Sequence, residues 1–310
     1  MGTVLVRVGL PASTGALVTA AEKIGAPVLI SANSLWEPAQ NAFRQPGLRL
    51  DGVDAALDSA GFVAMRRYGG YPWSVQQYVE MAGLYSWAWW AQQDLCCEPE
   101  IARDDAEVLR RVAGTADLLH QNLLWVMSLQ ARGAFWITDP MPVLQGWKPD
   151  HYRRSLEGAR RVLYVLGREW PKLVGVGSVC RRAVKGEAGI LAVLSALDGE
   201  LPPDTRLHLF GVKGTALPAL REHPRVCSID SMAWDFGARM DARKAGERAT
   251  MGARCAALQT WFERNATAAG HLLPEVGDLL DDMPSDLAAW TRAHPAEANA
   301  RYLLARDRSP

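Results

Sequence analysis

Three aspartates and one glutamine lie on short apolar runs of the sequence, where they could carry out chemistry together. These residues are Asp58, Asp94, Asp230 and Gln145. Burying a carboxylate among apolar residues is unfavourable unless the group is paired or used. One interpretation is that each acid satisfies a loop amide or an arginine. The presence of three such acids in one chain favours the other interpretation, which is a shared site.

Two carboxylates in one site are what a double-displacement glycosyl transfer requires. One carboxylate attacks the anomeric carbon and holds a covalent sugar, while the other moves protons for the leaving and entering groups. Gly61 lies in the same run as Asp58, and Gly177 lies in another apolar run, next to Ser178; both glycines would let a flat ring approach the backbone closely. A retaining glycoside hydrolase would use the same chemistry, but it usually has Glu, whereas these three acids are all Asp.

Short apolar runs recur along the chain and alternate with segments of helical spacing. Runs that are apolar throughout suit strands buried on both faces of a parallel sheet. The helical spacing is clearest over 103–130, 148–169, 186–198 and 241–269. The eight expected strands are 4–10, 27–32, 55–63, 88–95, 141–146, 173–179, 207–213 and 226–232.

Eight strands alternating with helices predict an α/β fold, namely a (β/α)8 TIM-like barrel with insertions and a C-terminal helical extension. The alternative is a doubly wound open sheet, which usually has a glycine-rich loop after its first strand, whereas residues 4–15 contain no GxGxxG. We expect the barrel domain over residues 1–270 and an extension over 271–310 that packs on it. In such a barrel the groups at the carboxyl ends of the strands meet at one mouth.

The composition limits the class of protein. Of 310 residues, 49% are hydrophobic and 22% charged, which excludes disorder and allows a sizeable core. Lys+Arg and Asp+Glu are both 34, so an overall basic coating is excluded but a local basic face is not. No apolar run approaches the roughly 18 residues that span a bilayer, so we expect no membrane partner. Five cysteines without a CxxC pair indicate a cytoplasmic protein rather than a disulfide framework.

Six short motifs follow one another in order between residues 55 and 235. They are Asp58–Phe62 (DSAGF), Asp94–Cys96 (DLC), Gln145-Gly146 (QG), Val174–Ser178 (VGVGS), Leu209–Val212 (LFGV) and Ser228–Ser231 (SIDS). In order and rough spacing they resemble motifs of the tRNA-guanine transglycosylase superfamily, where they read DSGGF/Y, Asp-Glu-Cys, VQGG, GGLAVGE, LMGVG and the strand of the nucleophile. The resemblance is greatest to the branch that places deazapurines in the DNA of phages and bacterial islands.

The resemblance implies a role for each matched residue. Asp230 would attack C1′ of the target nucleotide, and Asp58 would be the general acid/base. Asp94 would read the N1–H and 2-amino edge of a guanine-like base. The other substrate-binding residues that the motifs imply are Gln145, Gly146, Gly177, Ser178, Ser59 and, stacking on the base, Phe62.

A pentosyltransferase activity follows from these roles. The resemblance implies that guanine in DNA is replaced by a 7-deazaguanine, such as 7-cyano-7-deazaguanine, through a covalent aspartyl-glycosyl intermediate. The partners would be guanine-containing DNA and the free 7-deazaguanine base, with no cofactor. Helper proteins that open the duplex are left open as a further class of partner.

The chain departs from the superfamily at two points. The first glycine of DSGGF is Ala60 here, and the CxCxxC zinc cluster with its downstream histidine is missing. Cys255 and His271 alone cannot complete a tetrahedral site, so we expect no structural zinc. Because the zinc subdomain helps the tRNA enzymes to hold their substrate, its loss favours DNA. The alternatives are a relative that acts on tRNA and a non-catalytic nucleic-acid-binding subunit, although such a subunit would often lose its nucleophile.

Local basic segments could hold the nucleic-acid backbone. Residues 148–185 contain ten Lys or Arg against three acids, and residues 236–254 contain five against two. Basic faces of this size can neutralise several phosphates. Solvated helix faces would look the same in the sequence. We select Arg181 and Arg182, which directly follow an expected strand, and Arg239 as DNA-binding candidates.

Overall fold

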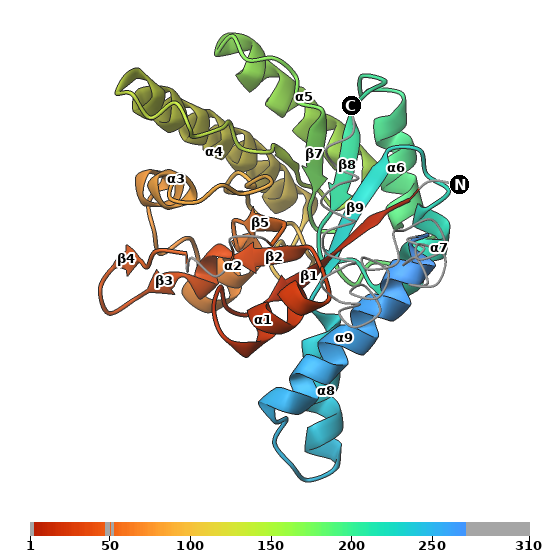
Figure 1. Cartoon of the computed structure of the whole chain (residues 1–310). Coiled ribbons are helices and arrows are strands. Elements are labelled where there is room, and N and C mark those ends of the chain that lie inside the picture. The colour runs from red at the N-terminus through yellow and green to blue at the C-terminus, as the bar shows by residue number, and fades with distance from the viewer. Residues whose placement is uncertain (1–2, 47–49, 51–52, 271–310) are drawn as a thin grey trace, which may run out of the picture.

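A curled parallel sheet forms the centre of the computed structural model, which describes residues 3–46, 50 and 53–270 (Figure 1). The seven strands pair in the order β5-β2-β1-β9-β8-β7-β6, and all of the pairs are parallel. A two-stranded antiparallel ribbon, β3–β4, lies apart from it. In chain order the strands are β1 Leu5–Leu10, β2 Val28–Ser31, β3 Trp36–Glu37, β4 Ala42–Phe43, β5 Ala55–Asp58, β6 Val143–Leu144, β7 Leu173–Val176, β8 Arg206–Leu209 and β9 Val226–Ser231.

Helices lie around this sheet (Figure 1). The core consists mainly of aliphatic side chains of the strands and of the helix faces turned toward them. The helices are α1 Ala16–Lys23, α2 Gly61–Tyr68, α3 Val75–Ala82, α4 Asp105–Ala131, α5 Pro149–Val165, α6 Ile190–Asp198, α7 Leu217–Leu220, α8 Ala233–Lys244 and α9 Met251–Ala268. Short 3-10 turns cover Ala32–Ser34 and Gly214–Ala216.

The edge strands β5 and β6 are linked by the extended segment 88–92. Leu57 in β5 forms a parallel bridge with Trp90, and Ala91 forms one with Met141, two residues before β6. The backbone N–H of Leu57 donates to the carbonyl of Trp89, and that of Gln92 donates to Met141. The sheet therefore curls until its two edges approach the same segment.

The fold prediction is confirmed at the level of an α/β fold with a curled parallel sheet. The expected strand 88–95 contributes isolated bridges instead of a regular strand, so a complete eight-stranded barrel is not established. Gln92 explains part of this departure, because its side chain bonds the carbonyls of Gln93 and Thr115 and accepts from Val143. Side-chain hydrogen bonds of Gln92 therefore help to fix this segment, which lacks a continuous ladder of backbone hydrogen bonds.

Two further boundaries differ from the sequence prediction. The expected strand 55–63 ends at Asp58, and α2 begins three residues later. The expected helix 241–269 is two helices, α8 and α9, and the second is started by Thr250, whose hydroxyl accepts from the N–H of Ala253. The predicted extension over 271–310 lies outside the described residues. Among the helices of the described residues, none combines the length and the hydropathy that a membrane span requires.

Candidate active site

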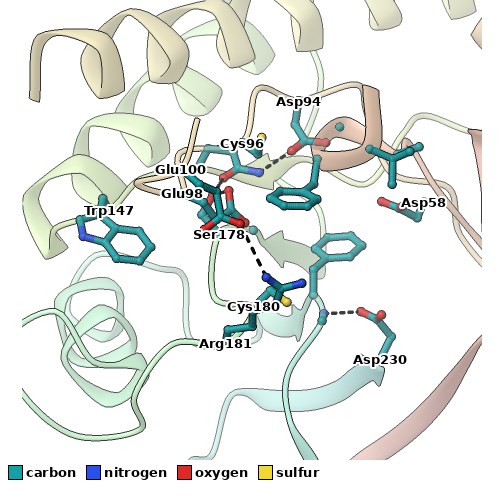
Figure 2. A pocket seen from close by; sticks show the side chains of 18 of the residues that line it. Asp58, Asp94, Cys96, Glu98, Glu100, Trp147, Ser178, Cys180, Arg181 and Asp230 are labelled. Atoms are coloured by element: carbon teal, nitrogen blue, oxygen red, sulfur yellow. Dashed lines mark hydrogen bonds and ion pairs between the residues drawn. The ribbon is translucent and has the colours of Figure 1, made fainter. Parts of the chain in front are cut away.

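A pocket of about 400 Å³ opens at the carboxyl ends of the strands and contains most of the predicted site residues (Figure 2). Asp58 ends β5, Asp230 lies at the end of β9, and Gly177 directly follows β7. In Figure 2, Asp58 and Asp230 lie on one side of the pocket and Trp147 on the other. The lining includes Asp58, Gly61, Phe62, Asp94, Cys96, Glu98, Glu100, Gln145, Trp147, Gly177, Ser178, Cys180, Arg181, Phe210, Gly211 and Asp230.

The turn between β5 and α2 places Asp58 and brings Gly61 against the base-reading candidate Asp94. Ala60 has a φ of +67°, in the left-handed region where a Cβ is unfavourable, which explains why glycine suits this position. A Cβ on Gly61 would lie 2.8 Å from the carbonyl oxygen of Asp94. Of the two glycines in the DSGGF motif, the chain therefore keeps Gly61, where close packing against Asp94 leaves no room for a Cβ.

The surroundings of Asp58 favour the protonated form of its carboxyl group. Burial is the main cause, and the nearby charges of Asp94 and Asp230 add to it, raising the pKa of Asp58 to about 8. The N–H of Ala60 and the side chain of Ser31 act in the opposite direction but are weaker. At neutral pH Asp58 is thus mostly a carboxylic acid, which can give a proton and later take one back.

Asp94 is a buried acceptor whose two carboxylate oxygens are each fixed by one donor. The hydroxyl of Ser59 donates to Oδ1 at 2.6 Å, and Nε2 of Gln145 donates to Oδ2. Burial raises the pKa of Asp94 to about 6, although both hydrogen bonds lower it. At neutral pH it is therefore mostly ionised. Because a carboxylate offers about four acceptor positions, roughly two remain for a ligand.

A chain of hydrogen bonds fixes the amide of Gln145 from behind. Its Oε1 accepts from the hydroxyl of Ser178 at 2.6 Å, and Ser178 Oγ accepts from the N–H of Cys97 at 2.7 Å. Oε2 of Glu98 lies 2.9 Å from the same hydroxyl. Since a hydroxyl has one proton, Ser178 can satisfy both partners only if Glu98 is protonated and donates to it. Burial raises the pKa of Glu98, in the direction that this arrangement requires.

Gly177 is the glycine on which the position of Gln145 depends. A Cβ at this residue would lie 2.7 Å from Cδ of Gln145, which is closer than atoms can approach. Gly146 has a different role, because it is absent from the pocket lining and a Cβ there would collide with His151 and Tyr152 of α5. Of these two matched glycines, the structure brings only Gly177 to the pocket.

Asp230 is oriented by a backbone N–H and lies beside a buried histidine. The N–H of Gly211 donates to its Oδ1 at 2.9 Å. Nε2 of His208 is 3.3 Å from the same oxygen but lacks the alignment of a hydrogen bond. Burial lowers the pKa of His208, so the ring is neutral, and its Nδ1 bonds the hydroxyl of Ser228 at 2.8 Å. Oδ2 of Asp230 carries neither of these contacts.

Of the two remaining substrate-binding candidates, Phe62 lines the pocket and Ser59 lies behind it, bonded to Asp94. Phe62 lines the pocket in the first turn of α2. Ser59 is fully buried and acts on the site through Asp94. Tyr71 completes this support: its hydroxyl donates to the carbonyl of Asp94 at 2.9 Å and accepts from the N–H of the same residue at 3.0 Å.

The three arginine candidates occupy different environments. Arg181 lines the pocket with a side chain that is 71% exposed, 3.7 Å from Glu100. Arg239 on α8 is exposed and forms an ion pair with Asp235 at 2.9 Å. Arg182 is 9% exposed, and its guanidinium donates to the carbonyls of Trp147, Ser178 and Ala188. The structure therefore places Arg182 in the framework of the site and not on a surface open to DNA.

Glu98 is the functional candidate that the sequence analysis missed. It follows Asp94 by four residues in the segment DLCCE, so an acid just beyond a strand-end acid was the available signal. No cluster of three or more His, Cys, Asp or Glu residues within the described part of the chain has the geometry of a metal site.

Polar and acidic groups gathered at the carboxyl ends of curled parallel strands define a class of barrel-like α/β enzymes, in which catalysis takes place at that end of the sheet. Within this class, residues 24–294 match the family model of DpdA, deoxypurine in DNA protein A. The chain belongs to this family, as the resemblance of its motifs predicted. None of the curated proteins compared with the chain matches it significantly. Family membership supports a transglycosylase-type enzyme that modifies DNA.

Proposed function

We propose that the chain exchanges guanine in DNA for a 7-deazaguanine base, such as 7-cyano-7-deazaguanine, through a covalent aspartyl-glycosyl intermediate. The observation that carries the proposal is the pairing of two aspartates in one pocket, where Asp58 has a pKa of about 8 and Asp230 keeps Oδ2 clear of the contacts that Gly211 and His208 make with Oδ1. One group can then move protons while the other forms a bond to the sugar.

In the first half of the reaction, an oxygen of Asp230 attacks C1′ of the target nucleotide. The bond between C1′ and N9 of guanine breaks, and its electron pair leaves with the base. Asp58, which carries a proton at neutral pH, gives that proton to the departing guanine. The products are a sugar ester on Asp230, a neutral guanine and the carboxylate of Asp58.

In the second half, a free 7-deazaguanine replaces guanine in the pocket. Its N9 attacks C1′, the ester bond to Asp230 breaks, and Asp58 accepts the N9 proton. Both aspartates return to their starting states, so each exchange needs no external acid, base or cofactor. The DNA is left with the new base on the same sugar.

The other groups of the pocket suit a guanine-like ring. Asp94 accepts only, so its free acceptor positions match the N1–H and 2-amino donors that guanine and 7-deazaguanine share. The amide of Gln145 is fixed by Asp94 and Ser178, which leaves one Nε2 hydrogen for the carbonyl oxygen of the base. Phe62 lines the same pocket and could stack on the ring.

Nucleoside mass spectrometry tests the proposed function directly. DNA and tRNA are isolated from cells that express the chain and are supplied with 7-deazaguanine, and from matched cells that express Asp230→Asn. Both nucleic acids are then digested to nucleosides. The expected result is a 2′-deoxynucleoside of the 7-deazaguanine base in the DNA of the first cells only. A deazaguanosine in tRNA instead would make the chain a tRNA enzyme, and the same DNA signal in the Asp230→Asn cells would remove the nucleophile assignment.

A further inference from the structure

Two apolar side chains are exposed directly after the proposed nucleophile. Met232 is 44% exposed and Phe236 is 70% exposed. Met232 is the residue that precedes α8, and Phe236 follows it by four positions, so both lie on the same side of the helix. Both residues follow Asp230, which itself lines the pocket.

Phe236 is not needed to attach α8 to the sheet. The helix is held by Trp234, which is 3% exposed and donates from its ring N–H to the carbonyl of Gly9 at 3.2 Å. Asp235, 2% exposed, adds an ion pair with Arg254 on α9 at 2.6 Å. Since these neighbours fix the helix, the exposed ring of Phe236 calls for another explanation.

The same helix carries exposed cations beyond the apolar pair. Arg239 and Arg243 are exposed, and Arg248 in the connection to α9 is exposed as well. Arg239 is partly neutralised by Asp235, and Lys244 lies 3.6 Å from Asp241. An apolar tip followed by arginines is complementary to DNA, in which stacked bases lie between rows of phosphates.

A guanine inside a duplex cannot reach an oxygen at the bottom of a pocket, so it must leave the base stack. Its departure leaves a gap, and proteins that open duplex DNA frequently insert apolar side chains between base steps. We propose that Phe236, supported by Met232, inserts into double-stranded DNA beside the target guanine and occupies the space that the guanine leaves. This inference rests on the proposed function and assigns Phe236 as a positioning residue.

Exchange of labelled guanine into the double-stranded and single-stranded forms of one circular DNA tests this inference. We expect Phe236→Ala to lower kcat/KM on the double-stranded form by about 10- to 100-fold, since base–aromatic stacking contributes energies of that order. On the single-stranded form, where the bases are already accessible, the loss should be no more than about threefold. Phe236→Tyr, which keeps the ring, should restore most of the activity on the duplex.

Phe135→Ala is the matched control, because Phe135 is 82% exposed but precedes β6, at the end of the sheet opposite to the pocket. It should exchange guanine like the wild type on both forms. Equal losses by Phe236→Ala on both forms, or no loss on the duplex, would overturn the inference alone. So would unchanged exchange accompanied by a change in oligomeric state, which would assign Phe236 to a protein interface. No exchange by the wild type on either form would overturn the proposed function as well.

Discussion

After burial and the charge of Asp94, the negative charge of Asp230 also raises the pKa of Asp58, although Asp230 and Asp58 end β9 and β5, which are separated in the sheet by β1 and β2. The curl of the sheet brings their carboxylates to one pocket. This relationship gives the proposed acid and the proposed nucleophile opposite tasks. Asp230 therefore contributes to keeping on Asp58 the proton that the first step of the proposed exchange needs.

Asp230→Asn should abolish base exchange. The amide oxygen can still accept from the N–H of Gly211, so the fold should persist, but an amide cannot form the sugar ester at a useful rate. We expect no covalent adduct with DNA on a denaturing gel and an unchanged circular dichroism spectrum. Asp241→Asn, which changes an exposed aspartate on α8, is the control and should behave as wild type. Full activity of Asp230→Asn would remove the nucleophile from this position.

Asp58→Asn should still form some adduct but turn over about 10²- to 10⁴-fold more slowly, because proton transfer to and from the bases is lost. The pH profile gives the sharper test. With a pKa of about 8, Asp58 holds its proton below pH 8 and loses it above, so adduct formation by the wild type should fall as the pH rises through 8. The decline should be absent in Asp58→Asn. A wild-type rate that rises through the same range would contradict the acid role.

The sequence allowed the main acids of the site to be found together. The carboxyl ends of parallel strands converge, so Asp58, Asp94 and Asp230 could be expected at one mouth once their runs were assigned as strands. The structure places all three in one pocket. Their chemical roles stay predictions, because convergence fixes where the groups lie and not what they do.

Other features depend on contacts that spacing does not reveal. Arg181 and Arg182 are neighbours in the sequence, yet the side chain of Arg181 is exposed and that of Arg182 is enclosed by carbonyl groups. Glu98 reaches Ser178 across 80 residues of sequence. In the segment 88–95, where a regular strand was expected, the side chain of Gln92 bonds the carbonyls of Gln93 and Thr115, and apolarity alone does not reveal such bonds.

Asp94→Asn should weaken binding of free guanine and 7-deazaguanine by roughly 10²- to 10³-fold. In the wild type both carboxylate oxygens already accept, from Ser59 and Gln145. An amide NH₂ at either position would face a donor, and a further donor on the base would be left unpaired. Calorimetry with the free base measures the effect. Ser59→Ala removes one support only and should cost about 1 kcal/mol, or roughly fivefold. Unchanged affinity in Asp94→Asn would place base reading elsewhere.

We expect Glu98 to support base binding by donating a hydrogen bond from its protonated carboxyl group to Ser178 Oγ. Glu98→Gln keeps a donor for Ser178 Oγ and should preserve base affinity within about threefold, whereas Glu98→Ala removes that donor and should weaken binding by roughly fivefold to tenfold. Burial raises the pKa of Glu98, so wild-type affinity should decline with rising pH once the group ionises, and Glu98→Gln should lack that decline. Calorimetry over a pH series checks both. If Glu98→Ala bound the base as tightly as the wild type, Glu98 would have no part in the chain of hydrogen bonds that fixes Gln145.

Gly177→Ala should disable base binding without a large change in the rest of the fold. The new Cβ would lie 2.7 Å from Cδ of Gln145, so the amide must move away from Asp94 and Ser178, and two buried hydrogen bonds are lost. At about 1 kcal/mol or more for each bond, we expect base affinity to fall at least tenfold. Gly70→Ala is the control, because a Cβ at Gly70 meets no atom within 4 Å. Calorimetry should show a loss for Gly177→Ala alone, and equal affinities of the two variants would mean that Gln145 is not held in place by this close approach.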